Sequence, residues 1–326
     1  MTAPLTDGFG RDFHYLRLSV EDACNFRCLY CLPDGYKKEH PEPPLSVAEI
    51  GRLTRAFAEL GFWKIRLTGG EPTVRQDILE IARTVVATPG IRQVSLSTNG
   101  YRLAELAEGL KAAGLWGVNV SVDSLQPARF HELTGHDKLA LVWEGVQRAL
   151  ALGLHTKINA VLLKDLNEGE FSDFLRLTKE LPLSVRFIEL MRTGDNEELF
   201  ARRHLSAAGL LSALAGEGWS ERARREGDGP ARVFEKAGHQ GSAGLIAPYA
   251  KDFCATCNRL RITSRGGLRL CLFAEGDVPL RPLLQHDGQK AELQALVRQS
   301  LGKKEVSHYL PDGVIGGTKH LAMVGG

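Results

Sequence analysis

Residues 16–33, LRLSVEDACNFRCLYCLP, join a strand-like run to three closely spaced cysteines. The leucines and valine of LRLSV fall on one face of an extended strand, and Arg17 and Ser19 fall on the other. The cysteines follow directly, with the spacing C-x3-C-x2-C. A strand that is polar on one face and ends in candidate metal ligands indicates a sheet whose polar face surrounds a bound group.

Five further strand-like runs follow, and helical patterns separate them. The first helix begins after Ser46, which forms a capping box with Glu49, and Gly61 ends it. Strands that alternate with helices pair in parallel, so this order predicts an α/β fold. The expected strands are residues 14–20, 64–70, 93–100, 117–124, 155–163 and 184–190, and the other expected helices lie near residues 76–87, 102–113, 139–152 and 169–181.

The polar faces of these strands distinguish between two kinds of α/β sheet. In residues 117–124, Asn119, Ser121 and Asp123 alternate with valines, and Lys157 lies on the polar face of a later strand. A parallel sheet that is covered on both sides is apolar on both, and a complete eight-stranded barrel fills its interior with branched aliphatic side chains. We therefore predict a partial (β/α)6 barrel around a polar cavity. A sheet with one wet face is the alternative.

The composition of the whole chain is typical of a soluble globular protein. The chain has 326 residues, of which 43% are hydrophobic and 25% charged, and its net charge is +2. This charge is too small to indicate a nucleic-acid partner, and no apolar run reaches the ~20 residues of a membrane span. The N-terminus lacks the pattern of an export signal, so we expect a cytoplasmic protein without a membrane partner.

The character of the sequence changes near residue 200. We expect residues 1–200 to form the partial barrel and residues 201–326 to form a C-terminal region. Within that region, residues 202–219 are typical of one helix and residues 231–235 of a strand. The stretch 200–240 holds no motif that points to a function.

Cys24, Cys28 and Cys31 have the chemistry of an incomplete metal site. Structural zinc takes four nitrogen or sulfur ligands, and neither His14 nor His40 has a suitable spacing. A 4Fe–4S cluster normally takes four thiolates, so a cluster on three keeps one iron open for a small molecule. Disulfides are the alternative, which a reducing compartment disfavours. The position of the triad after the first strand places this site at the mouth of the barrel.

A second triad, Cys254, Cys257 and Cys271, lies in residues 253–273, FCATCNRLRITSRGGLRLCLF. It also lacks a fourth ligand nearby. A zinc site completed by the distant His239 or His286 is one interpretation, but zinc ligands usually cluster in sequence. We favour a second iron–sulfur cluster with its own open iron, which would bind the substrate.

Basic residues surround both of these features. Arg17, Arg66 and Lys157 point toward the predicted lumen by strand parity, and a buried charge requires a partner. Arginine forks match phosphate oxygens in geometry. The expected ligand is therefore a polyanion such as a nucleoside triphosphate, held by side chains because no Walker-type loop is present. Further arginines between the cysteines of the second triad are Arg259, Arg261, Arg265 and Arg269.

The first triad, with Tyr30 before its last cysteine, resembles the signature of the radical S-adenosylmethionine enzymes. The stretch Gly69-Gly70-Glu71-Pro72 resembles the one that meets the methionine amino group in that superfamily. The resemblance implies a cluster whose open iron binds S-adenosylmethionine. One electron cleaves the bound molecule to methionine and a 5′-deoxyadenosyl radical, which removes a hydrogen atom from the substrate.

Longer stretches resemble one family of that superfamily, the GTP cyclases of molybdenum cofactor biosynthesis. They are residues 16–33, IRLTGGEP, LSTNG, NVSVDS, KINAV, FIELM, residues 253–273 and the terminal glycine pair. Leu32 departs from the resemblance, because the family often has methionine there. The family reaction takes the hydrogen from ribose C3′ and joins C3′ to C8 of guanine. The implied product is (8S)-3′,8-cyclo-7,8-dihydroguanosine 5′-triphosphate.

The same resemblance implies roles for individual residues. Two 4Fe–4S clusters are expected, the first on Cys24, Cys28 and Cys31, and the second, whose free iron contacts guanine, on Cys254, Cys257 and Cys271. The residues expected at S-adenosylmethionine are Tyr30, Gly70, Ser121 and Met191. Those expected at GTP are Arg17, Arg66, Thr98, Lys157, Arg259, Leu260 and Arg261, although Thr98 has the wrong strand parity. The tail, Gly325 and Gly326, is expected to thread toward the active site and to be needed for turnover.

The resemblance also implies partners, namely a second copy of the chain, an external electron donor and a cyclic pyranopterin monophosphate synthase that receives the product. A two-cluster radical enzyme acting on a peptide or an RNA base is the nearest alternative. Peptide-modifying relatives usually carry more C-terminal cysteines, and an RNA substrate requires a more basic surface. An electron-transfer or zinc-stabilised binding protein would need four ligands at each site, and each triad has three.

Overall fold

The computed structural model describes residues 4–38 and 41–325 of the chain. Its central part alternates strands with helices, which confirms the α/β prediction, and all six expected strands are present. The strands are β3 (Tyr15–Glu21), β4 (Lys64–Gly69), β5 (Gln93–Thr98), β6 (Gly117–Ser121), β7 (His155–Leu162) and β8 (Ser184–Glu189). The helices between them are α1 (Val47–Glu59), α2 (Ile78–Val86), α3 (Leu103–Ala112), α4 (Pro127–Thr134), α5 (Leu139–Ala151) and α6 (Phe171–Glu180).

Strands β3 to β8 lie side by side in sequence order, and all of them pair in parallel. The C-terminal part of the chain extends this sheet at both edges. There, β12 (Arg259–Ile262) pairs in parallel with β3, and β11 (Ser242–Ile246) pairs in parallel with β8. The outermost strands are antiparallel: β13 (Gly267–Arg269) and β14 (Val278–Pro279) on one side, β10 (Arg232–Glu235) and β9 (Ser220–Glu221) on the other.

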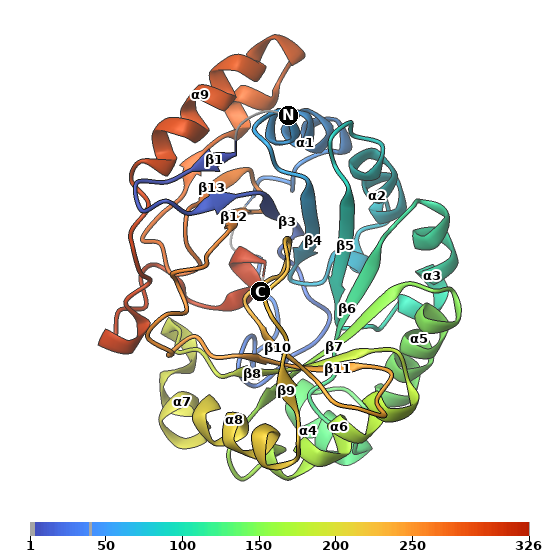
Figure 1. The fold of residues 1–326 in the computed structure, drawn as a ribbon. Helices are drawn as coiled ribbons and strands as arrows, with labels where there is room; N and C mark the ends of the chain where they lie inside the picture. The colour runs from blue at the N-terminus through green and yellow to red at the C-terminus, as the bar shows by residue number, and fades with distance from the viewer. Residues whose placement is uncertain (1–3, 39–40, 326) are drawn as a thin grey trace.

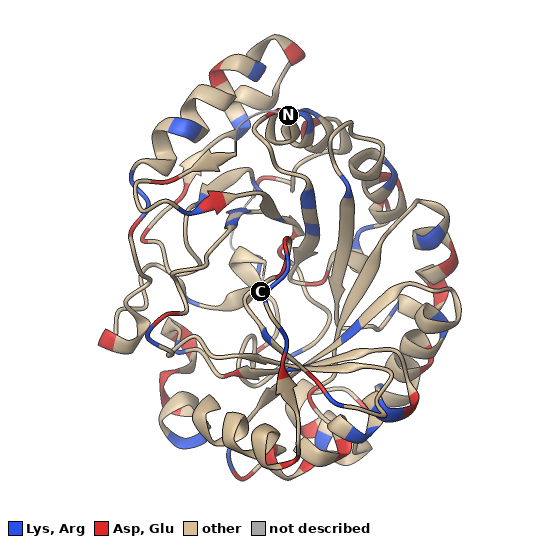
Figure 2. Cartoon of the chain, in the orientation of Figure 1, with Lys and Arg blue, Asp and Glu red and all other residues tan. Residues whose placement is uncertain are grey.

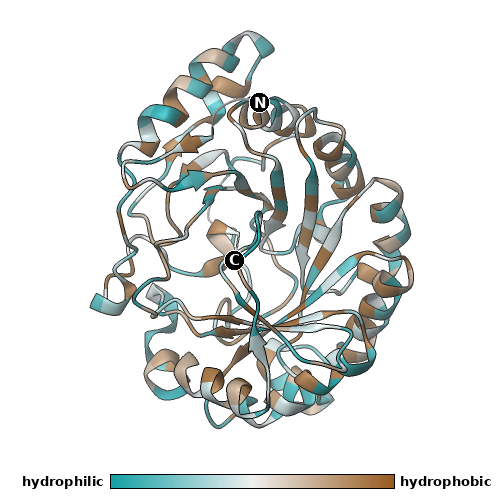
Figure 3. Cartoon of the chain, in the orientation of Figure 1, coloured by the Kyte–Doolittle hydropathy of each residue, from teal (hydrophilic) through white to brown (hydrophobic). Residues whose placement is uncertain are grey.

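The sheet curves, and its helices lie along the outer side, as Figure 1 shows. The hydropathy colouring of Figure 3 marks apolar residues along the strands and on the helices around them. Leu16 and Leu18 of β3 are fully buried, as their parity predicts. Helix α1 begins as expected, because the Ser46 hydroxyl accepts from the Glu49 amide at 3.2 Å and the Glu49 carboxylate accepts from the Ser46 amide.

The register of the parallel strands brings the polar residues into adjacent rows. Arg17 of β3 pairs with Arg66 of β4 on one side and with Arg261 of β12 on the other. Lys157 of β7 pairs with Asn119 of β6. Because side chains of paired positions in parallel strands point to the same side, this row of cations faces the concave side of the sheet. The predicted polar lumen is therefore confirmed.

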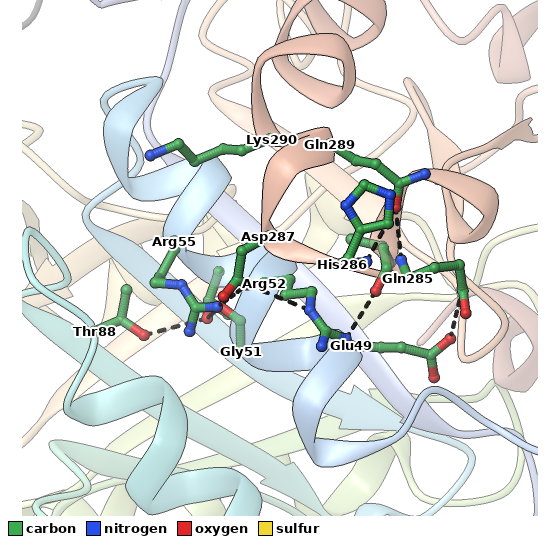
Figure 4. A network of polar contacts seen from close by, with 12 residues as sticks. Glu49, Gly51, Arg52, Arg55, Thr88, Gln285, His286, Asp287, Gln289 and Lys290 are labelled. Atoms are coloured by element: carbon green, nitrogen blue, oxygen red, sulfur yellow. Dashed lines mark hydrogen bonds and ion pairs between the residues drawn. The ribbon is translucent and has the colours of Figure 1, made fainter.

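A polar network joins the first helix to the C-terminal part of the chain (Figure 4). Arg52 and Arg55 of α1 both contact Asp287, at 3.3 and 2.8 Å. Glu49 accepts hydrogen bonds from Arg281 in η4 (Arg281–Leu284). These contacts, with those of α9 (Lys290–Leu301) on α1, fasten residues beyond 280 to the start of the barrel.

The C-terminal part differs from its expected local structure at one place. Residues 202–219 form two helix segments rather than one, α7 (Glu197–Arg203) and α8 (Ala207–Gly216). The break arises because Ser206 caps a new helix, its hydroxyl accepting from the Ala208 amide. None of the helices in residues 4–38 and 41–325 combines the length and the apolar character that crossing a membrane requires.

The remaining short elements connect these units. They are β1 (Leu5–Thr6) and β2 (Asp12–Phe13), which form a separate two-stranded sheet, and the 3₁₀ turns η1 (Pro72–Val74), η2 (Glu168–Glu170), η3 (Gly194–Asn196), η5 (Asp287–Gln289), η6 (Leu310–Asp312) and η7 (Leu321–Val324).

Candidate functional site

A cavity of about 290 Å³ lies on the concave side of the sheet. The ends of the parallel strands, the loop after β3 and the C-terminal segments all contribute to its wall. All six cysteines line this cavity, and none of them forms a disulfide. The two triads, which are separated by more than 200 residues in the sequence, therefore face one space.

The first triad lies in the loop between β3 and α1. The Arg27 and Leu29 amides donate to the carbonyls of Thr134 and Leu133, at 3.0 Å each, which fastens the loop to the end of α4. The Cys31 amide donates to the Cys28 carbonyl at 2.9 Å, so the last two cysteines share one turn. The chain thus presents the three thiols on a loop that is fixed from both sides.

Burial opposes the ionisation of these three thiols. Burial raises the pKa of Cys24 to about 11 and that of Cys31 to about 12, and it raises the pKa of Cys28 as well. A positive iron–sulfur core stabilises the thiolate form, which burial alone disfavours. Within the described residues, no three His, Cys, Asp or Glu side chains are grouped as ligands of a single metal ion. A 4Fe–4S cluster does not need that closeness, because each thiolate binds a different iron.

The second triad is held by segments from both ends of the chain. The guanidinium of Arg11 donates to the carbonyls of Cys254 and Val306 at 3.1 and 2.8 Å. Burial acts to raise the pKa of Cys257, but nearby cations, Arg259 first and then Lys304, outweigh it and lower that pKa. A thiol that is both buried and easily ionised suits metal binding.

The residues expected at S-adenosylmethionine all line the cavity, namely Tyr30, Gly70, Ser121 and Met191. The Tyr30 hydroxyl donates to the carboxylate of Asp123 at 2.8 Å, and Asp123 in turn accepts from the Val161 amide. Burial raises the pKa of Asp123 to about 6. A Cβ atom on Gly70 would collide with the carbonyl oxygens of Asp22 and Ala23, so this position accepts only glycine without movement of the loop.

Thr98 lines the cavity, but its hydroxyl is already engaged. It donates to Glu71 at 2.8 Å and accepts from the Gly100 amide. Glu71 also accepts from the Thr73 and Asn99 amides. Thr98 therefore supports the loop that follows β4 as well as facing the cavity.

The cations expected at GTP share this cavity, since Arg17, Arg66, Lys157, Arg259 and Arg261 all line it. Figure 2 shows basic residues on β4, in the interior of the curved sheet. The Nε of Arg66 is buried without a hydrogen-bond partner among the described residues. This donor is therefore available to an acceptor on a bound group.

Crowding of like charges changes the acidity of these groups. Burial, followed by the charges of Arg186, Arg66 and Lys64, lowers the pKa of Lys157 to about 5. Burial and Arg259 lower the pKa of Arg261 to about 10. Burial is the first cause of these shifts and neighbouring cations the second, so an anionic ligand in the cavity would favour the charged forms.

Two of the expected residues stand apart from the others. The side chain of Leu260 is fully buried and packs in the hydrophobic core rather than against the cavity. Gly326 lies outside the described residues. Its neighbour Gly325 does reach the cation cluster, because its carbonyl accepts from Arg17 at 2.6 Å and from the Thr68 hydroxyl at 3.0 Å.

Curated relatives match this chain along nearly its whole length. A protein named GTP 3′,8-cyclase from Stenotrophomonas maltophilia is 54% identical over 323 residues, which cover 99% of each chain. The proteins of that name from Aeromonas hydrophila and Klebsiella pneumoniae are 51% and 49% identical, with 96% and 100% of their lengths covered and 99% and 100% of this chain. The chain belongs to the GTP 3′,8-cyclase family.

Two parts of this GTP 3′,8-cyclase family member match two different family models. Residues 18–178 match the radical SAM superfamily, and residues 183–310 match Molybdenum Cofactor Synthesis C. The crystal structure of Streptococcus suis SuiB bound to S-adenosylmethionine has the same fold, with a TM-score of 0.63 at 14% identity over 88% of this chain and 68% of that one. Membership in the radical SAM superfamily implies a 4Fe–4S cluster and S-adenosylmethionine.

Four cations that line the cavity were not among the predicted site residues, namely Arg11, Lys64, Arg186 and Lys304. Lys64 and Arg186 line the same wall as Arg66 and Lys157. Lys64 lies two positions before Arg66 on β4, and Arg186 alternates with buried Val185 and Phe187 on β8. The alternation of side chains along a strand, which identified Arg17, could therefore have predicted both Lys64 and Arg186.

Proposed function

We propose that this chain converts GTP to (8S)-3′,8-cyclo-7,8-dihydroguanosine 5′-triphosphate, the first step of molybdenum cofactor biosynthesis. One observation carries the proposal: a single cavity is lined by two cysteine triads and by a row of buried cations. The first triad is suited to hold the cluster of the superfamily's radical chemistry, and the cations are suited to bind a triphosphate. The activity for which the relatives are named requires both.

The proposal assigns the metal ligands as follows. Cys24, Cys28 and Cys31 hold the 4Fe–4S cluster that the superfamily implies. Cys254, Cys257 and Cys271 hold a second 4Fe–4S cluster with a free iron for guanine. The support for this second cluster is that its thiols are unpaired, line the same cavity and include one whose pKa is lowered by cations.

For S-adenosylmethionine we assign Tyr30, Gly70, Ser121 and Met191. When bound with its cluster, this cofactor would supply a 5′-deoxyadenosyl radical for removal of the hydrogen atom from ribose C3′. The protein itself orients the cofactor and the substrate and shields the reaction between them. The Tyr30–Asp123 hydrogen bond fixes the cysteine loop against the end of β6, and the backbone at Gly70 leaves room for a close approach.

For GTP we assign Arg17, Arg66, Thr98, Lys157, Arg259 and Arg261, and the cavity adds Lys64 and Arg186. Leu260, which we also expected at GTP, supports its neighbours from the core. Cations from strands β3, β4, β7, β8 and β12 surround one space, so they fix the phosphate chain and thereby the ribose.

The tail is proposed to take part in turnover. The Gly325 carbonyl accepts a hydrogen bond from Arg17, which is also a proposed GTP ligand. Gly325 has a φ of +75°, which favours glycine, and a Cβ atom there would collide with Thr68. Both the backbone conformation and the lack of space therefore favour glycine at this position. Gly326, which lies outside the described residues, belongs to the same proposal.

The working unit is proposed to be a barrel, residues 1–200, with a C-terminal region, residues 201–326. The proposed partners are a second copy of the chain, an external electron donor and the cyclic pyranopterin monophosphate synthase that consumes the product. The radical SAM match ends at residue 178 and the second match begins at residue 183, which supports two functional parts.

An anaerobic reaction tests the proposed function. The protein, reconstituted with iron and sulfide, is incubated with S-adenosylmethionine, dithionite and GTP. We expect 5′-deoxyadenosine and an isomer of GTP with unchanged mass. Cys257→Ser is expected to abolish the isomer. Formation of 5′-deoxyadenosine with GTP left intact would retain the superfamily chemistry and reject the substrate.

A further inference from the structure

The loop between β9 and β10 lies in the stretch where the sequence showed no functional motif. It reaches the middle of the barrel in Figure 1, and Figure 2 shows acidic and basic residues along it. Four consecutive residues of this loop, Gly227 to Pro230, line the same cavity as the cations. We propose that this loop, the strap (residues 222–231), is an internal competitor: it stays in place, and the phosphates of the nucleotide compete with its carbonyl and carboxylate groups for the cation cluster.

The first contact of the strap is with a cation of the barrel. Lys64 Nζ donates to the carbonyl oxygen of Gly227 at 2.7 Å. Lys64 is buried, on the same face of β4 as Arg66. The strap carbonyl therefore takes a hydrogen bond that a phosphate oxygen in this cavity would otherwise accept.

Glycine is required for this approach. Gly227 has a φ of +80°, and a Cβ atom there would collide with the ring of Trp63. Trp63 directly precedes Lys64, so the strap rests on the indole and reaches past it to the lysine. A larger residue would lift the strap away from the cation cluster.

The second contact is electrostatic and comes from Asp228. Its carboxylate accepts from Arg222 at 3.0 and 3.2 Å and from the Arg225 amide at 2.8 Å, which fixes its position. Asp228 lines the cavity together with the barrel cations. From there its charge acts to raise the pKa of three of them, with a smaller influence than burial and than the repulsion between the cations. These cations are Lys64, Lys157 and Arg186.

Asp228 is thus a partial counter-ion for cations that are otherwise crowded. A triphosphate brings several negative charges to the same cations and meets Asp228 as a like charge. The Asp228 carboxylate stabilises the nucleotide-free state of the cavity and destabilises the nucleotide-bound state. Both effects reduce the affinity for the phosphate chain, which defines the strap as a competitor rather than a ligand.

The rest of the strap is held in place, so the competition does not require the loop to leave. Asn258 Nδ2 donates to the Asp228 carbonyl at 3.1 Å, and Arg224 donates to the same carbonyl and to that of Thr256. Asn258 and Thr256 flank Cys257. The strap therefore joins the phosphate-binding cations to the segment that carries the second triad.

The inference rests on the proposed function for the identity of the occupant, and its test is a binding measurement on the reconstituted holoenzyme. Anaerobic calorimetry with GTP, and separately with inorganic tripolyphosphate, compares the wild type with Asp228→Asn. This change keeps the shape and removes the charge. We expect both ligands to bind about fivefold more tightly, with a lower KM for GTP and no rise in kcat.

Glu226→Gln is the matched control. Glu226 lies in the same strap, but its side chain is 74% exposed and faces Arg92 at 3.6 Å. We expect this variant to bind both ligands as the wild type does. Gly227→Ala, which lifts the strap from Lys64 without a change of charge, is expected to shift binding in the same direction as Asp228→Asn.

Unchanged or weaker binding in both Asp228→Asn and Gly227→Ala overturns the strap proposal, because the loop would then be neutral or a ligand. Cyclisation that proceeds normally alongside this result leaves the proposed function standing. If the wild type makes no cyclic product but Asp228→Asn still tightens tripolyphosphate binding, the strap proposal stands and the proposed function fails.

Discussion

At the scale of the residue, the main feature of the site is a set of buried cationic side chains. Lys157 shows this most clearly, because burial and three neighbouring cations lower its pKa from 10.5 to about 5. Since the folded pKa lies below the unfolded one, the unfolded chain binds more protons between these values. The stability that Lys157 contributes therefore rises with pH across that window and is lowest near its lower end.

This shift predicts that nucleotide binding takes up protons. A triphosphate favours the charged form of Lys157, so its pKa rises on binding and the lysine is protonated at neutral pH. Calorimetry of GTP binding in two buffers of different ionisation enthalpy measures the uptake, which we expect to approach one proton. Lys157→Met should reduce it. A binding enthalpy that does not depend on the buffer would contradict the prediction.

At the scale of the element, function lies where each strand ends. Strand β4 ends in Gly69 and continues into Gly70 and Glu71, whose carboxylate gathers hydrogen bonds from Thr73, Thr98 and Asn99. This network holds the glycine loop against the end of β5. The Gly70 and Glu71 amides, which donate to the carbonyls of Glu21 and Ala23, hold the loop against the segment that leads to the first cysteines. The geometry of one loop is therefore set by the ends of two neighbouring strands.

Gly70→Ala tests that element. The added methyl group would meet backbone carbonyls, which cannot move as a side chain can, so the loop must shift. We expect a loss of about 1–3 kcal/mol in the free energy of unfolding, and S-adenosylmethionine binding at least about tenfold weaker. Thermal denaturation and equilibrium binding measure the two effects.

Gly209→Ala provides the comparison, since a Cβ atom there meets nothing within 4 Å. It should leave S-adenosylmethionine binding as in the wild type and, because alanine favours a helix over glycine, raise the free energy of unfolding by up to about 1 kcal/mol. If Gly70→Ala also binds S-adenosylmethionine normally, the close approach at this loop is not needed.

Strand parity predicts most of the cavity wall, because side chains alternate strictly along a strand. Arg17, Arg66 and Ser121 face the cavity on the side that this alternation assigns to them. Thr98 shows where the rule fails, since it lies at the last position of β5 and faces the cavity despite its parity. The backbone bends where a strand passes into a loop, and alternation does not continue through the bend.

At the scale of the whole molecule, the two parts of the chain form one sheet. Strand β12 covers the edge of β3, and β11 covers the edge of β8. Leu245 and Leu260 of these strands belong to the same hydrophobic core as the barrel. The C-terminal part is therefore needed for the barrel to bury its edges.

This arrangement predicts that residues 1–200 do not fold alone. Without residues 201–326, β3 and β8 expose unpaired backbone groups and the core loses its outer layer. We expect that fragment to aggregate or to unfold without a cooperative transition, whereas the full chain melts cooperatively. Size-exclusion chromatography and thermal circular dichroism measure this. A soluble fragment with a sharp transition would show that the barrel is autonomous.

The amino-acid sequence by itself determined the alternating α/β order, the polar lumen and the two cysteine triads. These features depend on spacings of a few residues, which local periodicity and ligand chemistry fix. Only the tertiary structure decided that both triads face one cavity and that the strap meets Lys64. Such contacts join residues far apart in the chain, and their register depends on how the sheet is completed, which no local pattern encodes.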